Sequence, residues 1–459
     1  MLDPGLSKSP SANRFGGAWA AAARLVSRWL DRHQRVDELF EALPPGMIGA
    51  DRARCQHLVF GVVRHFGRLD AELKRLVAHP PRFETRAVLL LAGFELIEAQ
   101  ARGNPDGAGE DKEKDKAGGE GLTAKIVHHA VEQAKTLASP AEARLVNAVV
   151  RKLAVALVKS PPPKLADAAV LAEYFSHPEW LVRRWLTQAG ADATRRLLEW
   201  NQQPATVYAR WRGPEGSAPP DWFKPTPWPG FSEVPSGRWP EVEQLLKEGK
   251  IYLQDPATRL AVDLLAPQAG ETVLDVCAAP GGKSLLIADA LLRAGGAGTG
   301  RVVALDLPGP RIERLKQNLS RATGVDVALV QGDLLSGEFR LFDDHRLPTE
   351  YSAVLLDVPC SNTGVMRHRV DVKWRLQERD FAQHARQQLS LLHAAARLVA
   401  PGGRLVYSTC SVDPEENAQV LKNFFDSRAG GPFKLETSLT SLPWESGHDG
   451  AGAFMLRRQ

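Results

Sequence analysis

Cysteine is scarce in this chain of 459 residues, which holds only Cys55, Cys277, Cys360 and Cys410. None of them forms a CxxC pair or clusters with histidine, so the sequence lacks the spacing of a structural zinc site and we expect no metal. Four widely spaced thiols also make no disulfide framework. A bridge between Cys360 and Cys410 stays open as an alternative, although a cytosolic chain would keep both thiols reduced.

A long hydrophobic segment is missing as well. The first residues, MLDPGLSKSPSANRFGG, lack the apolar region of a secretory signal, and the run WAAAARLV is too short to span a bilayer. Neither sign of charge is in large excess, because the net charge is +4. We therefore expect a cytoplasmic protein with no membrane partner, whose charge permits an anionic partner without requiring one.

The length predicts two or three domains. We expect residues 1–15 to form a disordered tail and residues 16–160 to form an all-helical domain. One apolar helical face in this domain is made by Leu58, Val59, Val62, Val63 and Phe66. Residues 101–121 contain glycines and mixed charges but no apolar residue larger than alanine, which predicts a disordered insertion.

Two features of the first 250 residues are compatible with RNA binding but do not require it. Residues 165–250 hold seven of the eleven tryptophans and many prolines, which indicates a small α+β connecting domain. The tryptophans either pack a small core or stack on bases. Five arginines within two dozen residues either form a solvated helical face or contact phosphates: Arg52, Arg54, Arg64, Arg68 and Arg75.

From residue 251 the sequence pattern changes. Short apolar strands alternate with helices that begin near Ser284, Pro310 and Glu378. The strands are ETVLDVCA, RVVALD, VALVQGD, SAVLLDVP and GRLVYST. This alternation predicts an α/β domain over 251–459, with a Rossmann-like parallel sheet and helices on both faces.

A turn with two glycines follows the first of these strands. Gly281 and Gly282 would let the backbone approach a ligand closely, whereas the lack of GxGxxG and of Walker lysine spacing disfavours a pyrophosphate. Asp306, Asp333 and Asp357 end the next three strands, where carboxylates can accept hydrogen bonds from a ribose or an adenine amine. One such aspartate is as often a turn former, but three of them favour a nucleoside-containing cofactor.

Cys360 and Cys410 come after the fourth and fifth strands. If these strands are neighbours, both thiols and Asp357 meet the glycine turn at one edge of the sheet. This grouping suggests methylation at C5 of a pyrimidine: one thiolate adds to C6 and makes C5 nucleophilic, and the other thiol assists proton removal or release. A carboxyl group at the N3 edge would stabilise the adduct. The alternative is that both cysteines are small buried hydrophobic residues.

Five motifs follow one another in the last 209 residues, in the order DVCAAPGGKS, ALDLPGPRIERLKQN, GD, DVPCSNTGVMRHRVDVKW and YSTCSVDPEENAQVL. Together they resemble the RNA cytosine-5 methyltransferases that use S-adenosylmethionine. The set is specific, because a generic methyltransferase lacks both cysteines. Val358 and Val370 depart from the family's usual alanine and proline, which puts loop shape in doubt but removes no reacting group.

The resemblance implies a role for each matching residue. Cys410 would attack C6, Cys360 would assist release, and Asp357 would contact the substrate base and the cofactor. Asp306 would hold the ribose and Asp333 the adenine region. The methionine side of S-adenosylmethionine would be lined by Cys277, Ala278, Ala279, Pro280, Gly281, Gly282 and Lys283.

The helical half has a resemblance of its own. DRARCQHLVFGVVRHFGRLD and RLVNAVVRKLA resemble the RNA-binding domain of the antitermination factor NusB. A NusB-like domain joined to this catalytic domain resembles bacterial enzymes that methylate 16S ribosomal RNA. The resemblance therefore implies methylation of a cytosine in 16S ribosomal RNA, and we expect a monomer. The same chemistry on transfer RNA, or a non-catalytic RNA-binding assembly factor, are the alternatives.

Overall fold

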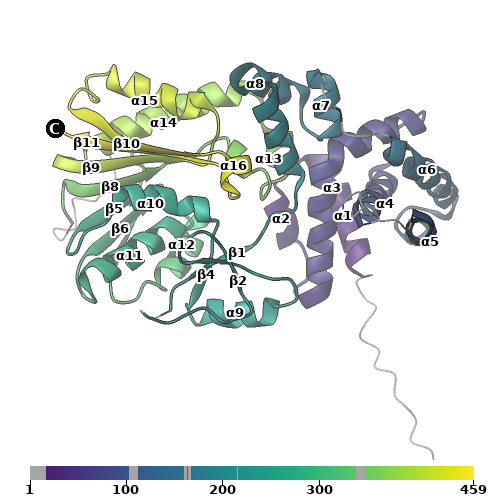
Figure 1. The fold of residues 1–459 in the computed structure, drawn as a ribbon, viewed down its shortest axis with the longest axis horizontal. Coiled ribbons are helices and arrows are strands. Elements are labelled where there is room, and N and C mark those ends of the chain that lie inside the picture. The colour runs from purple at the N-terminus through teal and green to yellow at the C-terminus, as the bar shows by residue number, and fades with distance from the viewer. Residues whose placement is uncertain (1–16, 103–111, 160–162, 164–166, 214–215, 337–346) are drawn as a thin grey trace, which may run out of the picture. The chain divides into compact units, whose positions relative to one another are not determined.

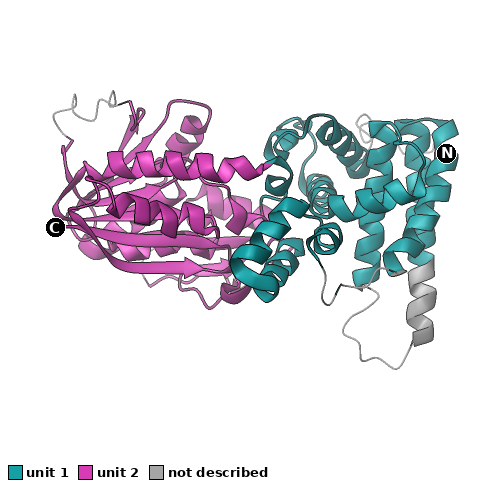
Figure 2. Cartoon of the chain, turned by 90° about the horizontal axis from the view of Figure 1, so that it is seen from above, with its two compact units in different colours: residues 1–203, 369–375 teal, residues 204–368, 376–459 magenta. Residues whose placement is uncertain are grey.

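The computed structural model describes residues 17–102, 112–159, 163, 167–213, 216–336 and 347–459. The chain divides into two compact units, one of residues 1–203 with 369–375 and one of residues 204–368 with 376–459 (Figure 2). The division falls inside the segment 165–250, which the sequence presents as one connecting domain. The expected tail at 1–15 lies outside the described residues.

Every element described in the first unit is a helix. These are α1 (Ala18–Arg32), α2 (Val36–Glu41), α3 (Gly49–Leu76), α4 (Phe83–Arg102), α5 (Lys112–Leu137), α6 (Pro140–Lys159), α7 (Ala168–Tyr174), α8 (Glu179–Gln202) and the short α13 (Val372–Arg375). The predicted apolar face of α3 is buried in their common core, where Leu58, Val59, Val62 and Val63 are fully shielded from solvent. Amphipathic and apolar helices thus bury one another's side chains around a single core.

The segment 101–121 is only partly described. Residues 103–111 lie outside the described residues, whereas α5 begins at Lys112, inside the segment that the sequence presents as a loop. The run KEKDKA at its start has lysines and acidic residues three positions apart. Such residues favour helix, and such pairs support it, without any large apolar side chain.

Most of the five clustered arginines have partners inside the first unit. Arg54 pairs with Glu95, and Arg75 Nη2 lies 2.6 Å from Glu173 Oε2. Arg68 donates to the carbonyl oxygen of Leu157 at 3.1 Å, and Arg64 is buried. These contacts favour a structural role for the cluster, since a paired or buried guanidinium is less available to phosphates.

A short segment of the second half of the chain, 369–375, packs into the helical unit. Val370 is buried in the helical core. Lys373 Nζ donates to the carbonyl oxygen of Arg64 at 2.9 Å, and Trp374 Nε1 donates to that of Val63 at 2.8 Å. The valine at position 370, where the resembling family usually has proline, therefore fills part of this core.

The second unit begins with a small antiparallel sheet in the order β2-β3-β1-β4. Its strands are β1 (Tyr208–Trp211), β2 (Lys224–Pro225), β3 (Phe231–Glu233) and β4 (Ile251–Leu253), and α9 (Trp239–Lys247) packs on it. Trp222 stacks on Phe223 with ring centroids 4.1 Å apart, and Trp228 contacts Tyr208 edge-on. In the other unit, Trp185 and Trp200 of α8 are buried. These four tryptophans thus contribute to local packing.

The main sheet of the second unit has the order β10-β11-β9-β8-β5-β6-β7 (Figure 1). The strands from β9 to β7 are parallel. They match the five predicted strands: β5 (Thr272–Val276), β6 (Arg301–Asp306), β7 (Asp326–Gln331), β8 (Tyr351–Asp357) and β9 (Val399–Thr409). The hairpin of β10 (Phe433–Ser441) and β11 (Ala451–Arg458) adds two antiparallel strands that were not predicted.

Helices cover both faces of this sheet, as predicted (Figure 1). Leu274, Val354 and Tyr407 pack in one cluster with α14 (Glu378–Ala396) and α15 (Ala418–Phe425). Val273, Leu355 and Val406, one position away in each strand, pack with α10 (Arg259–Leu265) and α11 (Gly282–Gly295). The remaining helices of this unit are α12 (Arg311–Leu319), α16 (Pro443–Ser446) and the 3-10 turns η1 (Pro256–Thr258), η2 (Thr363–Val365) and η3 (Pro414–Glu416). The pleat thus sends alternate side chains to opposite helical layers.

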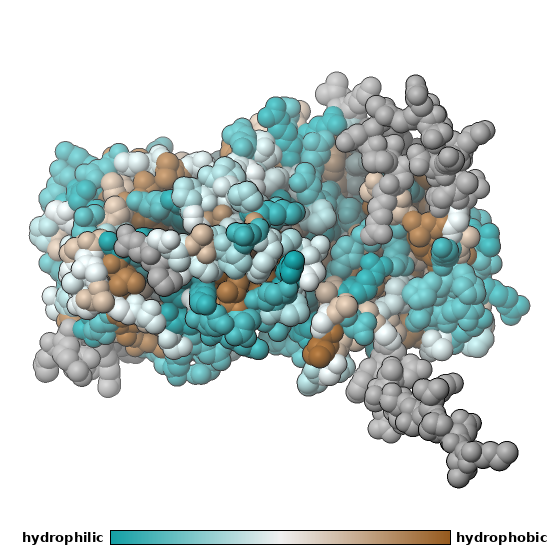
Figure 3. Space-filling model, turned by 60° about the horizontal axis from the view of Figure 1, so that its bottom comes forward, coloured by the Kyte–Doolittle hydropathy of each residue, from teal (hydrophilic) through white to brown (hydrophobic). Residues whose placement is uncertain are grey.

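Within the described residues, we find no helix with the length and hydropathy needed to cross a membrane. On the face shown in Figure 3, apolar residues form small patches among hydrophilic side chains.

Candidate active site

The predicted site residues meet at the carboxyl edge of the parallel sheet. The neighbour order β9-β8-β5-β6 places the loops that carry Cys410, Cys360 and the glycine turn next to one another, with Asp306 at the end of β6. Because crevices outside these strand ends are where open α/β sheets bind ligands, the topology makes this edge the candidate active site.

The glycine turn between β5 and α11 is shaped by close packing. Gly281 has φ +101°, and a Cβ atom there would lie 2.9 Å from Leu315 Cδ1. A Cβ atom on Gly282 would lie 3.0 Å from Gln254 Nε2. The left-handed backbone at position 281 therefore favours glycine, whereas a side chain at position 282 would require Gln254 to shift.

The two strand-end aspartates predicted for the nucleoside differ in their surroundings. Asp306 is buried, and its carboxylate accepts hydrogen bonds from the backbone N–H groups of Ala279 and Leu307, each at 2.8 Å. It thus ties the glycine turn to the end of β6. Asp333 is exposed, and its Oδ1 accepts from the N–H of Leu335 at 2.9 Å, which is the contact of a turn-forming aspartate.

Asp357 forms an ion pair within the site. Its Oδ2 lies 2.7 Å from Lys283 Nζ, and its Oδ1 accepts from Ser408 Oγ at 2.8 Å. Burial by itself lowers the pKa of Lys283, but the pair with Asp357 outweighs it and leaves the pKa above its ordinary value. Lys283 is therefore a fixed positive charge at this edge.

Cys360 and Cys410 are free thiols whose Sγ atoms lie 3.1 Å apart. This separation is too long for a disulfide bond of about 2.05 Å. Cys410 also contacts Asn362 Oδ1 at 3.3 Å. The hydrogen bond with Cys410, and then burial, raise the pKa of the Cys360 thiol well above its ordinary value. Cys360 consequently keeps its proton.

Cys277 is the third cysteine near this edge. Burial, reinforced by the charges of Asp306 and Asp357, raises the pKa of its thiol. It lies in the left-handed region with φ +61°, between β5 and the glycine turn. These properties fit a residue that shapes the turn, because a buried protonated thiol is a poor nucleophile.

A buried carboxylate that the sequence did not reveal, Glu416, holds the Cys360 loop. Glu416 Oε1 accepts from the N–H of Ser361 and from Gln388 Nε2, both at 2.9 Å. Tyr407 donates to the carbonyl oxygen of Glu416 at 2.6 Å. Glu416 follows Cys410 in the same motif, so its place in that motif was the one available signal.

The cysteine loops are also joined through their backbones. The N–H of Gly364 donates to the carbonyl oxygen of Cys410 at 3.0 Å, and the N–H of Gly450 donates to that of Gly364 at 2.9 Å. A Cβ atom on Gly364 would lie only 2.6 Å from the oxygen of Gly450. The β8, β9 and β11 ends thus form one closely packed assembly.

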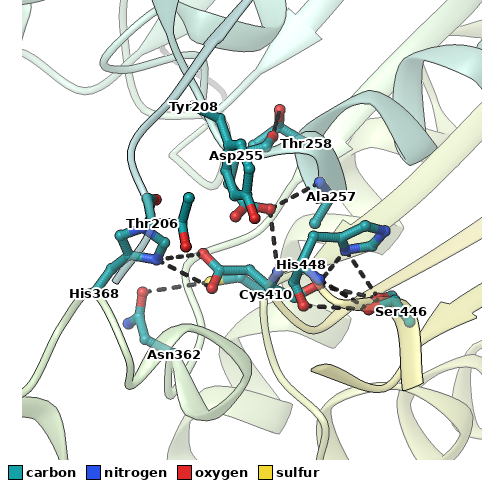
Figure 4. Close-up of polar contacts among 12 residues, drawn as sticks. Thr206, Tyr208, Asp255, Ala257, Thr258, Asn362, His368, Cys410, Ser446 and His448 are labelled. Carbon is teal, nitrogen blue, oxygen red and sulfur yellow. Dashed lines mark hydrogen bonds and ion pairs between the residues drawn. The ribbon is translucent and has the colours of Figure 1, made fainter. Parts of the chain in front are cut away.

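A pocket opens beside this assembly. Cys410, Lys283 and Ser408 line it together with Asp255 and Asp449. Figure 4 shows Asp255 and its neighbours around Cys410. The pocket therefore brings a thiol, an ammonium group and carboxylates to one space.

One group of side chains among the described residues has ligand atoms close enough for a metal, namely Asp255, His368 and Asp449. His368 Nδ1 lies 3.0 Å from Asp449 Oδ2, and its Nε2 lies 3.2 Å from the carbonyl oxygen of Thr206. Since both ring nitrogens face acceptors, both carry protons and neither offers a lone pair to a metal. The group is an ion-pair cluster.

Solved structures share this fold. The crystal structure of PH0851 superposes with a TM-score of 0.68 and 21% identity, covering 98% of this chain and all of that one. A methyltransferase homolog from Pyrococcus horikoshii superposes with a TM-score of 0.51 and 23% identity, covering 64% of this chain and all of that one. These likenesses show the fold alone, which is a Rossmann-like parallel sheet with helices on both faces.

Sequence comparisons find similarity to ribosomal RNA methyltransferases. Residues 262–443 match the family model of the 16S rRNA methyltransferase RsmB/F. The ribosomal RNA small subunit methyltransferase B of Salmonella paratyphi B is 29% identical over 464 residues, covering 95% of this chain and 97% of that protein. That of Citrobacter koseri is 29% identical over 427 residues, covering 88% of this chain and 89% of that protein. The chain is thus similar to the RsmB/F methyltransferases, through the family model over residues 262–443 and through these relatives over most of its length.

Proposed function

We propose that this chain methylates C5 of a cytosine in 16S ribosomal RNA, with S-adenosylmethionine as the methyl donor. The observation that carries the proposal is the pair of free thiols 3.1 Å apart at the sheet edge. Methyl transfer to most acceptor atoms requires no cysteine, whereas C5 of a pyrimidine needs a nucleophile at C6. The names of the curated relatives support ribosomal RNA of the small subunit as the substrate.

The residues of the turn fit the proposed cofactor. Cys277, Ala278, Ala279, Pro280, Gly281, Gly282 and Lys283 would line its methionine side. The buried carboxylate of Asp306 keeps lone pairs for ribose hydroxyls after accepting from Ala279 and Leu307. Asp333 would contact the adenine region, and Asp357 would lie near both the cofactor and the base. When bound, S-adenosylmethionine supplies an electrophilic methyl group.

Cys410 is the proposed nucleophile. It lines the pocket, in which the positively charged ammonium group of Lys283 also lies. The thiolate forms a bond to C6 of the cytosine. Asp357 would lie at the N3 edge of the base, where its partner Lys283 would offset the negative charge of the adduct. Because C6 is shielded in a stacked helix, the target nucleotide must be flipped out or single-stranded.

Cys360 is proposed to act at the end of the reaction. Its thiol keeps a proton and touches Cys410 Sγ. When the bond from Cys410 to C6 breaks, the sulfur leaves as a thiolate that needs this proton. The helical unit, which resembles NusB in sequence, is proposed to bind the RNA.

The different roles of the two thiols give the test. With labelled RNA and S-adenosylmethionine, Cys410→Ala should form no covalent RNA complex on a denaturing gel, since the first bond cannot form. Cys360→Ala should accumulate a complex, because its adduct forms but collapses slowly. The double variant should again form none.

Cys55→Ala is the matched control, since it removes a thiol buried in the other unit. It should turn over RNA without accumulating a complex. A complex in Cys410→Ala alone would reverse the two roles. Turnover by both single variants would refute covalent catalysis by either cysteine.

A further inference from the structure

Asp255 lines the pocket and has one carboxylate oxygen without a hydrogen-bond partner among the described residues. Its Oδ1 accepts hydrogen bonds from the N–H groups of Ala257 at 2.9 Å and Asp449 at 3.1 Å. Its Oδ2 is buried and has no hydrogen-bond partner among the described residues. Asp255 lines the pocket together with Cys410. A buried acceptor without a partner is costly, so its presence beside a reacting group calls for a function.

Asp255 lies close to other ionisable side chains, among them His368 (Figure 4). His368 carries two ring protons, as its contacts with Thr206 and Asp449 require. Burial by itself lowers the pKa of His368, but Asp449 outweighs burial and raises it. The imidazolium ion of His368 thus forms its ion pair with Asp449, and it acts on Asp255 from a greater distance.

Asp255 is suited to take up a proton near neutral pH. Burial raises its pKa to about 6, and the charge of Asp449 adds to the rise. The N–H of Ala257 and the cation of His368 act in the opposite direction. A base with a pKa just below neutrality is ionised at working pH and still binds a proton well.

The other ionisable side chains near this pocket either hold a proton or already accept hydrogen bonds. Lys283 and Cys360 hold their protons. Both oxygens of Asp357 accept hydrogen bonds, from Lys283 and Ser408. Both oxygens of Asp449 face His368. Of these groups, Asp255 is the one with a carboxylate oxygen that has no hydrogen-bond partner among the described residues.

The geometry points to Asp255 as the residue that accepts the proton from C5 of the methylated adduct. This inference rests on the proposed cytosine-5 chemistry. Asp255 Oδ2 forms a bond to the C5 proton, and the electrons of the C5–H bond become the second bond between C5 and C6. The C6–S bond breaks, its electrons stay on Cys410, and the Cys360 thiol supplies the proton for that sulfur.

Asp255→Asn tests this assignment with little disturbance. The asparagine keeps an oxygen for the N–H groups of Ala257 and Asp449 and replaces only Oδ2. Decay of the covalent complex after one turnover should slow by about 100-fold to 10,000-fold, the usual contribution of a general base. Release of tritium from RNA labelled at cytosine C5 should slow equally. Asp263→Asn, on the exposed side of α10, is the control and should leave both rates unchanged.

The pH dependence separates a base from a structural residue. Asp449 and His368 face Asp255, with Arg367 acting on His368 and Lys283 in the same pocket. Decay of the complex in the unmodified protein should rise with pH to a plateau above pH 6. Cys360→Ala should keep this dependence on its slower rate, Asp255→Asn should lose it, and Asp255→Glu should regain it.

Two outcomes distinguish failure of the inference from failure of the proposed function. If Cys360→Ala accumulates a complex while Asp255→Asn decays at the original rate with the original pH profile, Asp255 is not the base and the cysteine chemistry stands. If no variant forms a complex, the covalent mechanism itself is wrong, and the assignment of Asp255 falls with it.

Discussion

Four residues of one type behave differently because their surroundings differ. Burial raises the pKa of the Cys55 thiol to about 11, and burial with nearby carboxylates raises that of Cys277 further. Cys360 is buried and hydrogen-bonded to Cys410. Cys410 is only partly buried and lines the pocket beside Lys283. Of the four thiols, Cys410 therefore has the surroundings that agree with the proposed nucleophile.

Asp306 allows a residue-level prediction about the cofactor. Asp306→Ala should weaken binding of S-adenosylmethionine by roughly 1 to 3 kcal/mol, because ribose hydroxyls and the N–H of Ala279 both lose an acceptor. Isothermal titration calorimetry measures this loss. Asp326→Ala removes an exposed carboxylate at the start of β7 and serves as the control. Equal affinity in a folded Asp306→Ala would remove Asp306 from the binding site.

Strand-end position predicts some site residues and not others. Asp357, Cys360 and Cys410 stand just after apolar runs, so the sequence places them at the sheet edge, and the structure brings them together. The positions of Glu416 and Asp255 at the site are not predicted in this way, because neither residue directly follows an apolar run. Their environments depend on contacts with residues far away in the chain, such as Gln388 and Asp449.

At the scale of elements, β5 carries a buried carboxylate in its interior. Asp275 Oδ2 accepts from Ser284 Oγ at 2.5 Å, whereas Oδ1 is buried without a partner among the described residues. Burial raises the pKa of Asp275 to about 7, the hydrogen bond with Ser284 lowers it, and Asp357 raises it again. The strand therefore holds its aspartate in the protonated form at mildly acidic pH.

This carboxylate makes the stability of the protein depend on pH. The pKa of Asp275 is higher in the folded chain than in the unfolded chain, so its contribution to stability is lost as pH rises toward about 7. Asp275→Asn cannot ionise and should avoid this loss. The free energy of unfolding of the variant, relative to that of the unmodified protein, should therefore rise by about 1 to 3 kcal/mol between pH 5 and pH 8.

Thermal denaturation at the two pH values measures this change. Asp326→Asn, at the exposed start of β7, should show no growing advantage. If the difference in melting temperature between Asp275→Asn and the unmodified protein is the same at pH 5 and pH 8, Asp275 does not titrate in this range.

Periodicity predicted the parallel strands but not the antiparallel hairpin. Buried strands on both faces are nearly continuous apolar runs, which the sequence displays in β5, β6 and β8. In β10, only Phe433 and Ser441 are buried, so the strand FKLETSLTS lacks the alternation of a half-buried strand. Its place in the sheet is set by pairing with β11, which the sequence does not show.

At the scale of the whole molecule, the division into units follows contacts more than sequence order. Helices α7 and α8 belong to the helical unit, whereas the strands that follow them belong to the catalytic unit. The segment 369–375 returns to the helical unit between the Cys360 loop and α14. Composition predicts a boundary near 250 because it detects local changes, and it cannot detect which elements pack together.

The segment 369–375 depends on the helical unit for its packing. Val370 and Trp374 pack against the helical core, and Lys373 bonds to Arg64 within it. A shortened chain that begins at Pro204 would contain this segment but lack the helices that bury it. The full chain is therefore the proper form for functional measurements.

We propose that the full chain converts a cytosine of 16S ribosomal RNA to 5-methylcytidine. The direct measurement is mass spectrometry of nucleosides from 16S ribosomal RNA and from transfer RNA, each incubated with the protein and S-adenosylmethionine carrying a deuterated methyl group. We expect labelled 5-methylcytidine in 16S ribosomal RNA with the unmodified chain and none with Cys410→Ala. Label in transfer RNA alone, in another nucleoside, or in no nucleoside would contradict it.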